Sequence, residues 1–342
     1  MVTVDPYATT DFLTYEFTSS TVAWALGFPR NQGAYWVART VDGGKHWQMR
    51  YKSQGDGLGT GPFVIRFFDE KRGFVAAGTS GKLLRTTDGG ATWKPLSVPE
   101  SGNSYLRFDD EMHGLMVVPN LSNSVPSRSY ADRTAHLYAT DDAGDSWKKL
   151  PDPPTGMYLM ASRGSGEVWL AGATTGTPRV YRSLDGGWSW QLRDIPIDTA
   201  GLGAGPWTTS VNLLPGKGVL MTVFCQCDSP SSYFFESFDG GATWRSLPDA
   251  PSPNSPVRHV AAYQDDFHWW YVEAKALYRT SDAGQTWTKI SDQLPDGLFV
   301  PRTIDMKHAW AQIANGSFNS YGLATTSDAG LHWTRVTVPR ST

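Results

Sequence analysis

Short apolar runs alternate with polar or glycine-containing turns along the whole chain, and groups of four such runs form a repeat. In the second repeat, residues 63–69, 74–78 and 82–86 carry the first three runs, and the fourth begins at Trp93. Short runs rich in Val, Ile, Phe and Leu between turn residues are typical of β-strands. The pattern therefore predicts four antiparallel strands in each repeat, A to D.

One sequence phrase recurs seven times, each time before the fourth run of a repeat. It consists of a Ser or Thr, a spacer, Asp, a small residue, Gly, two spacers and Trp, as in Thr40 to Trp47. Its aspartates lie 43 to 54 residues apart, which is room for about four short strands, the size of a propeller blade. These aspartates are Asp42, Asp88, Asp142, Asp185, Asp239, Asp282 and Asp328.

We expect the phrase to form the turn between strands C and D. Asp can accept hydrogen bonds from backbone N–H groups about two residues further on, and Gly at the fifth position supplies a positive φ. The leading Ser or Thr can bond locally, and the Trp ring would wedge between neighbouring blades. A set of seven metal or catalytic aspartates is the alternative. Because a site is rarely built seven times at one spacing, we assign the phrase to the scaffold.

The repeat predicts an all-β fold, a single seven-bladed β-propeller of four-stranded antiparallel blades over residues 1–342. In such blades the A–B and C–D turns emerge on one face, and the B–C and D–A loops on the other. Because uniform turns occupy the first face, we expect function on the loop face and at the mouth of the central channel. The predicted blades span approximately residues 12–52, 62–98, 103–151, 156–195, 207–248, 257–292 and 298–339.

Composition argues against several classes of function. The chain has 30 basic and 33 acidic residues, a net charge of −3 and no basic run, so we expect no nucleic-acid partner. It has no run of 18 apolar residues, so we expect no membrane span. The histidines show no metal-ligand spacing, and no Ser-His-Asp or Cys-His arrangement emerges. We therefore predict neither a metal nor a cofactor, and no catalytic residue can be named.

The two cysteines, Cys225 and Cys227, are separated by a single glutamine. Free thiols are the favoured interpretation. The alternatives are a strained disulfide across one residue and a metal site completed by ligands from elsewhere.

The phrase Thr-x-Asp-Gly-Gly-x-Thr-Trp, preceded by a strand such as Gly73 to Gly78, resembles the Asp-box, or bacterial neuraminidase repeat, of β-propellers. The resemblance covers nearly all of the chain. Its short blades and the amino-acid sequence of residues 85–93 are most similar to the photosystem II assembly-factor type and its bacterial relatives. The motif is specific for fold and weakly specific for function, because sialidases, tandem-propeller xyloglucanases and sortilin-type receptors also carry it.

Two departures from these families bear on activity. Sialidases have six blades and an Arg-Ile-Pro segment, whereas this chain has seven phrases and only Phe28-Pro-Arg30. Xyloglucanases pair two rings, and one is predicted here. We therefore expect a monomeric, non-catalytic binding or assembly scaffold that contacts a protein or a glycan. We expect it to be extracytoplasmic or secreted, and the sequence leaves open whether a signal peptide has been removed. A glycoside hydrolase or other carbohydrate-active enzyme is the alternative.

Four of the seven repeats carry a charged residue at one position of the first strand. Aligning the repeats on the residue that opens strand B places Glu16, Arg66, Arg107 and Arg302 at one position of the innermost strand. In a closed ring their blades are neighbours, so the four would form an arc at the channel. Guanidiniums there would bind a carboxylate or phosphate, because Arg offers a rigid two-pronged donor. The alternative is that they pair with nearby carboxylates and fill a wet channel.

Loop aromatics form a second candidate set, Tyr35, Tyr130, Trp207 and Tyr233. They could stack on sugar rings or anchor a protein partner. The alternative is packing between blades, where most aromatics of such a fold lie. Acidic residues of the loop face are scattered, with no two at a spacing that indicates glycoside hydrolysis.

Overall fold

The computed structural model describes residues 11–29, 35–53, 63–77, 82–100, 104–120, 130–164, 166–174, 177–197, 207–225, 231–248, 262–273, 275–314 and 321–338. These residues form β-strands and one 3₁₀ turn, and none of them lies in an α-helix. Within these ranges no helix has the length and apolarity needed to cross a membrane. The chain divides into two compact units, unit 1 (residues 1–96, 250–252 and 259–342) and unit 2 (residues 97–249 and 253–258).

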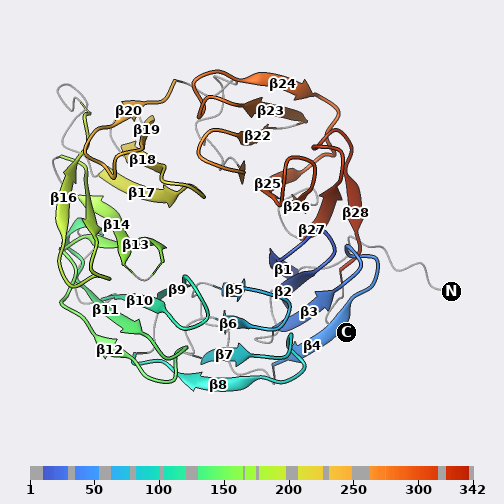
Figure 1. Ribbon diagram of the computed structural model, residues 1–342, viewed down its shortest axis with the longest axis horizontal. Coiled ribbons are helices and arrows are strands. Elements are labelled where there is room, and N and C mark those ends of the chain that lie inside the picture. The colour runs from blue at the N-terminus through green and yellow to red at the C-terminus, as the bar shows by residue number, and fades with distance from the viewer. Residues whose placement is uncertain are drawn as a thin grey trace. The chain divides into compact units, whose positions relative to one another are not determined.

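Unit 1 holds four antiparallel sheets, each made of four consecutive strands paired in sequence order (Figure 1). The first two sheets are β1 (Asp11–Phe17), β2 (Ala23–Pro29), β3 (Trp36–Thr40), β4 (Gln48–Lys52), and β5 (Phe63–Phe67), β6 (Gly73–Ala77), β7 (Lys82–Thr86), β8 (Lys94–Ser97). The other two are β21 (Ala262–Tyr263), β22 (Trp269–Glu273), β23 (Ala276–Thr280), β24 (Thr288–Ser291), and β25 (Leu298–Thr303), β26 (Ala309–Ala314), β27 (Tyr321–Thr326), β28 (Thr334–Val336).

Unit 2 holds three further groups of four consecutive strands, and a short pairing of β14 with β17 joins the last two groups into one sheet. A 3₁₀ turn, η2 (Tyr130–Asp132), precedes β11. The strands are β9 (Tyr105–Phe108), β10 (Gly114–Pro119), β11 (Ala135–Thr140), β12 (Lys148–Lys149), then β13 (Met157–Arg163), β14 (Glu167–Thr174), β15 (Arg179–Ser183), β16 (Gln191–Asp194), then β17 (Trp207–Leu213), β18 (Val219–Cys225), β19 (Ser231–Ser237), β20 (Arg245–Ser246).

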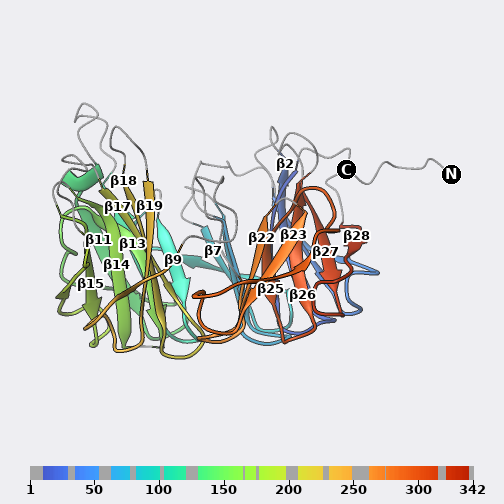
Figure 2. The same ribbon diagram turned by 90° about the horizontal axis from the view of Figure 1, so that it is seen from above.

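Buried side chains between the sheets set their order within unit 1. Tyr15 of the first sheet packs in one cluster with Trp310 of the last sheet. Trp24, on the other side of the first sheet, stacks on Phe67 of the second with ring centres 3.7 Å apart. Sheet β1–β4 therefore lies between β25–β28 and β5–β8, an order that can be followed in Figures 1 and 2. The same kind of apolar contact joins β21–β24 to β25–β28.

The repeated phrase forms one hydrogen-bonded turn between the third and fourth strand of every four-strand group. In the first, the Thr40 hydroxyl donates to Asp42 Oδ1 (2.9 Å) and accepts from the Gly44 N–H (2.9 Å). Asp42 Oδ1 also accepts from the N–H of His46 (2.9 Å). The other six phrases repeat these three bonds. The carboxylate thus reaches four residues forward, not about two as the sequence suggested.

Two consecutive residues of each phrase have left-handed backbone. The glycine at the fifth position has φ between 77° and 98°, as expected. The small residue before it is also left-handed, and here Ala143 (φ 59°), Ala283 (59°) and Ala329 (66°) replace glycine. A side chain is disfavoured in this region, so these three positions carry backbone strain that the glycine repeats avoid.

The Trp that closes the phrase packs between adjacent sheets in several repeats. Trp47 meets Trp310 edge to face at 6.4 Å, and Trp244 meets Trp169 at 6.1 Å. The Trp47 indole N–H donates to the carbonyl of Gly44, at 3.2 Å. The turn and the inter-sheet packing are therefore built from the same eight residues.

A second capped turn joins the first and second strands of four sheets. Its aspartate accepts the N–H groups two and three residues on, and its carboxylate pairs with a basic side chain at the third. In antiparallel strands both kinds of turn fall at the same end of the sheet. We call this end the turn edge and the opposite end the loop edge. The four aspartates are Asp69, Asp110, Asp265 and Asp305.

Candidate functional site

Glu16, Arg66 and Arg302 meet in unit 1 as one ion-pair cluster. Arg66 Nη1 lies 2.6 Å from Glu16 Oε1, and Arg302 Nη1 lies 2.9 Å from Glu16 Oε2. Each residue is the last but one of its strand, β1, β5 or β25, and these strands belong to sheets that pack against each other. The strands end at the turn edge, so the cluster lies there. From the sequence we expected function on the loop face and at the channel mouth, with these residues in an arc at the channel; that arc stays a prediction.

The cluster carries one more positive than negative charge. The Glu16 side chain is 10% exposed and both of its oxygens are engaged, whereas the Arg66 and Arg302 side chains are 43% and 46% exposed. For both arginines, Nε and Nη2 find no protein acceptor within the described residues. One buried carboxylate therefore holds two guanidiniums that still offer donors to solvent or to a ligand.

Aromatic rings hold the two guanidiniums in place. Arg302 lies 5.2 Å from the Tyr15 ring centre, and its Nη1 also donates to the Tyr15 carbonyl (3.2 Å). The Tyr15 hydroxyl donates to the Trp310 carbonyl (3.0 Å), and burial raises its pKa above the usual value. Arg66 lies 5.4 Å from the Phe68 ring centre. Sequence reasoning missed both rings, although each lies one or two residues from a charged member of the cluster.

Arg107 belongs to unit 2 and has its own carboxylate partner. Its Nε lies 3.1 Å from Asp109 Oδ1, which also accepts the Ser162 hydroxyl at 2.8 Å. The Arg107 side chain is 46% exposed. Its place in an arc with the other three residues stays a prediction.

The loop aromatics differ from one another in burial. Trp207 opens β17 and is fully buried, and Tyr35 is 6% exposed, which matches the alternative of packing between sheets; ligand contact by the loop aromatics stays a prediction. Trp207 packs in one cluster with Trp169, and Tyr35, which precedes β3, packs in one cluster with Phe67 of the neighbouring sheet. Tyr233 is partly buried, with its ring centre 6.4 Å from that of Trp207. Tyr130 begins η2, and its side chain lies outside the described residues.

Cys225 is buried and disulfide-bonded, and no cysteine in the described ranges is free. The expectation of free thiols is therefore wrong for Cys225, while Cys227 lies outside the described residues. Among the residues that the structure describes, no group of three or more His, Cys, Asp or Glu side chains could hold a metal ion.

Short antiparallel sheets with capped turns define an all-β fold of the β-propeller type. No protein-family model matches the chain. The fold is similar to that of a structure of Ycf48 bound to D1 peptide, with a TM-score of 0.62 and 18% identity over 99% of this chain and 97% of that one. The likeness supports the photosystem II assembly-factor type of propeller that the sequence had suggested, at the level of fold.

Two sequence relatives point to different functions. The chain is 25% identical over 288 residues to the photosystem II assembly lipoprotein Ycf48 of Synechococcus sp. (strain CC9902), covering 80% of this chain and 74% of that protein. It is also 25% identical over 254 residues to the xyloglucanase Xgh74A of Acetivibrio thermocellus, covering 64% of this chain. The match spans only 29% of that enzyme's length.

Proposed function

We propose that this protein is a non-catalytic binding scaffold that takes a carboxylate group of its partner at the ion-pair cluster. The observation that carries the proposal is the unused donor edge of Arg66 and Arg302. A guanidinium presents its donors in a rigid fork that matches a carboxylate, and such charge-assisted bonds are about twice as strong as neutral ones. Phosphate would meet the same donors, and the test below includes it.

The cluster is preorganised for such a ligand. Glu16 holds Nη1 of each arginine, and Tyr15 and Phe68 support the guanidinium planes. Binding therefore orders few side chains, which lowers its entropic cost. The partner's carboxylate can belong to a peptide or to an acidic glycan. The Ycf48 structure with a bound peptide favours the peptide.

The alternative of a glycoside hydrolase finds no support in this cluster. Glycoside hydrolysis uses two facing carboxyl groups, one as acid and one as nucleophile or base. Glu16 is the cluster's one carboxylate, and both of its oxygens are bound to arginine. An enzyme of this class would need its carboxylates elsewhere.

We further propose that the seven four-strand groups close into one seven-bladed propeller, with the blade bounds given above. Seven phrases and a fold likeness over 99% of the chain support this arrangement. Arg107 would then extend the ion-pair cluster. A location outside the cytoplasm is supported by the disulfide of Cys225, because disulfides persist in oxidising compartments, and by the lipoprotein relative. We expect a monomer, which sedimentation would test.

The test replaces both arginines by lysine, in the double variant Arg66→Lys/Arg302→Lys. Lysine keeps a positive charge next to buried Glu16, whereas alanine would leave that carboxylate buried without a partner and destabilise the fold. Arg72→Lys, at an exposed arginine paired with Asp69 outside the cluster, is the matched control. The probes are short peptides with free or amidated C-termini, uronic-acid oligosaccharides and inorganic phosphate.

We expect free-acid peptides to bind, amidated ones to bind less, and the double variant to bind at least roughly 10-fold more weakly. Loss of one charge-assisted hydrogen bond costs about 1.5–3 kcal/mol, which sets that factor. Arg72→Lys should bind as the wild type does. Equal binding by the double variant would refute the assignment of the cluster. Cleavage of the oligosaccharides would refute the non-catalytic role.

A further inference from the structure

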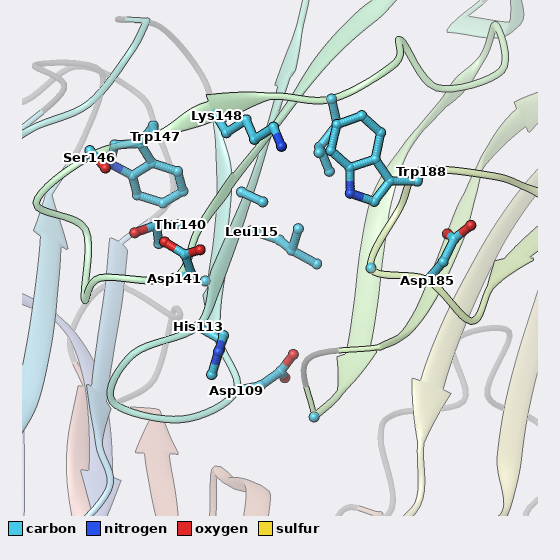
Figure 3. Close-up of a pocket in the computed structure, with 15 residues that line it drawn as sticks. Asp109, His113, Leu115, Thr140, Asp141, Ser146, Trp147, Lys148, Asp185 and Trp188 are labelled. Carbon is cyan, nitrogen blue, oxygen red and sulfur yellow. The ribbon is translucent and has the colours of Figure 1, made fainter.

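A cavity at the turn edge of unit 2 is a second candidate site. The cavity has a volume of about 400 Å³ and lies between sheet β9–β12 and strands β13–β16. Figure 3 shows Asp141 on one wall, Asp185 and Trp188 on the other, and Lys148 reaching toward Trp188. Small-molecule sites occupy roughly 300–1,000 Å³, so the size suits a small ligand.

Trp188 is the feature of this cavity that the repeat does not explain. The turn bonds around it come from Ser183, Asp185, Gly187 and Ser189, and none uses the indole. The Trp188 residue is nevertheless 47% exposed, and its ring nitrogen turns toward the cavity (Figure 3). The other phrases carry Lys45, Ala91, Asp145, Ala242, Gln285 and Leu331 at this position.

Three polar groups around the cavity have no hydrogen-bond or ion-pair partner in the described part of the chain. They are the Trp188 indole N–H, the Lys148 ammonium and the Asp141 carboxylate. Lys148 Nζ lies 4.6 Å from the Trp188 ring centre, a cation–π contact. Two donors and one acceptor are thus available, and the charges of Lys148 and Asp141 cancel.

The remaining carboxylates of the cavity are already engaged. Asp109, 7% exposed at its side chain, accepts from Arg107 and Ser162, and Asp185 accepts the bonds of its own turn. The free groups therefore present one positive and one negative charge beside an exposed aromatic face, and the hydrogen-bonded Asp185 adds a further negative charge that disfavours an anion. That combination suits an uncharged ligand that has both hydroxyl groups and an apolar surface.

We propose that this turn-edge cavity binds a neutral sugar residue, with one pyranose ring stacked on Trp188. The C–H groups on the flat side of a pyranose carry partial positive charge and meet the negative face of the indole. Its hydroxyls both donate and accept, so they match Lys148, the indole N–H and Asp141. Lys148 exchanges its contact with the ring for a hydrogen bond to a hydroxyl.

A protein partner fits this cavity less well. A stable protein interface covers about 800 Å² on each side, whereas the three free groups and the exposed ring surround a single hollow. The site does not depend on Arg66 or Arg302, neither of which lines the cavity. Failure of one proposal therefore would not refute the other.

The test is titration of the whole chain with cello-, xylo-, malto- and N-acetylglucosamine oligosaccharides, followed by calorimetry and tryptophan fluorescence. Trp188→Ala is the main variant, because alanine occupies this position in two other phrases, Ala91 and Ala242, and so keeps the turn. Leu331→Ala is the matched control, at the same position of the seventh phrase and with Leu331 45% exposed.

We expect saturable binding of at least one oligosaccharide, weakened roughly 10-fold or more by Trp188→Ala and unchanged by Leu331→Ala. Asp141→Asn should weaken it several-fold, and the Arg66→Lys/Arg302→Lys variant should bind sugar normally. The proposal is overturned if no sugar binds saturably, if Trp188→Ala binds as well as the wild type, or if a short-peptide panel binds this cavity in place of sugars.

Discussion

Two glycines at the same position of the repeated turn should respond differently to alanine. Gly43 and Gly89 both have left-handed backbone, with φ of 72° and 73°. A Cβ on Gly43 would have its nearest neighbour at 3.5 Å, the carbonyl oxygen of Ser20, which is an ordinary contact. A Cβ on Gly89 would lie 2.8 Å from both Arg39 Nη1 and the Glu70 carbonyl oxygen. The pair therefore separates backbone strain from steric overlap.

The magnitudes follow from these two terms. Alanine in the left-handed region costs about 1–2 kcal/mol. Alanine also restricts the unfolded chain more than glycine does, which stabilises the folded state by about 0.4–1 kcal/mol. Gly43→Ala should therefore lower the free energy of unfolding by about 1 kcal/mol. Gly89→Ala adds overlap with a backbone oxygen that cannot rotate away, typically about 1–3 kcal/mol more. The expected total for Gly89→Ala is about 2–4 kcal/mol.

Calorimetric melting of the two variants measures the difference. An unfolding entropy of about 2.1 cal/mol/K per residue over 342 residues converts each kcal/mol into about 1.4 °C. Gly43→Ala should melt about 1–2 °C below the wild type, and Gly89→Ala about 3–6 °C below it. Alanine is native at this position in Ala143, Ala283 and Ala329, so the smaller loss is compatible with folding. Equal losses in the two variants, or a larger loss for Gly43→Ala, would refute the reasoning.

Two further outcomes are expected. In six of the seven phrases, hydrogen bonds from the side chain or backbone N–H four residues on hold the aspartate pKa at about 2, below its ordinary value of 3.8. A depressed carboxyl pKa stabilises the fold above pH 4, so denaturation midpoints should fall as pH drops from 4 toward 2; an unchanged midpoint over that window would contradict the turn chemistry. Tyr15→Phe removes the buried hydroxyl bond to the Trp310 carbonyl and should cost about 1 kcal/mol in urea denaturation. Anion binding should survive, because the ring under Arg302 remains; loss of binding without loss of stability would show that the hydroxyl, not the ring, positions Arg302.

The repeated turns were predictable because every contact in them is local. Thr40, Asp42, Gly44 and His46 lie within seven residues, so their spacing in the sequence already contains the hydrogen-bond pattern. The alternation of apolar runs likewise predicted the four-strand groups and their pairing in sequence order. The reach of the aspartate, four residues rather than about two, needed coordinates because it depends on two consecutive left-handed residues.

Contacts between sheets set the limits of the sequence reasoning about the site. Alignment of the repeats placed Glu16, Arg66 and Arg302 at one strand position. The ion pairs that they share form only because sheets from the two ends of the chain pack against each other. Trp207, at the expected start of the fifth blade, was grouped with the loop aromatics, whereas it opens a strand and its side chain enters the core. A shift of one residue in such a boundary moves a side chain to the opposite face.

The sequence by itself determined the all-β fold class, the four-strand period and the turn chemistry, because these depend on neighbours within a few residues. Only the tertiary structure decided which charged and aromatic groups are free to meet a ligand. Trp188, Lys148 and Asp141 lie in two different repeats, and their cavity exists only where the sheets that carry them pack together. Exposure of a side chain is a property of its surroundings, and the surroundings of these three come from distant parts of the chain.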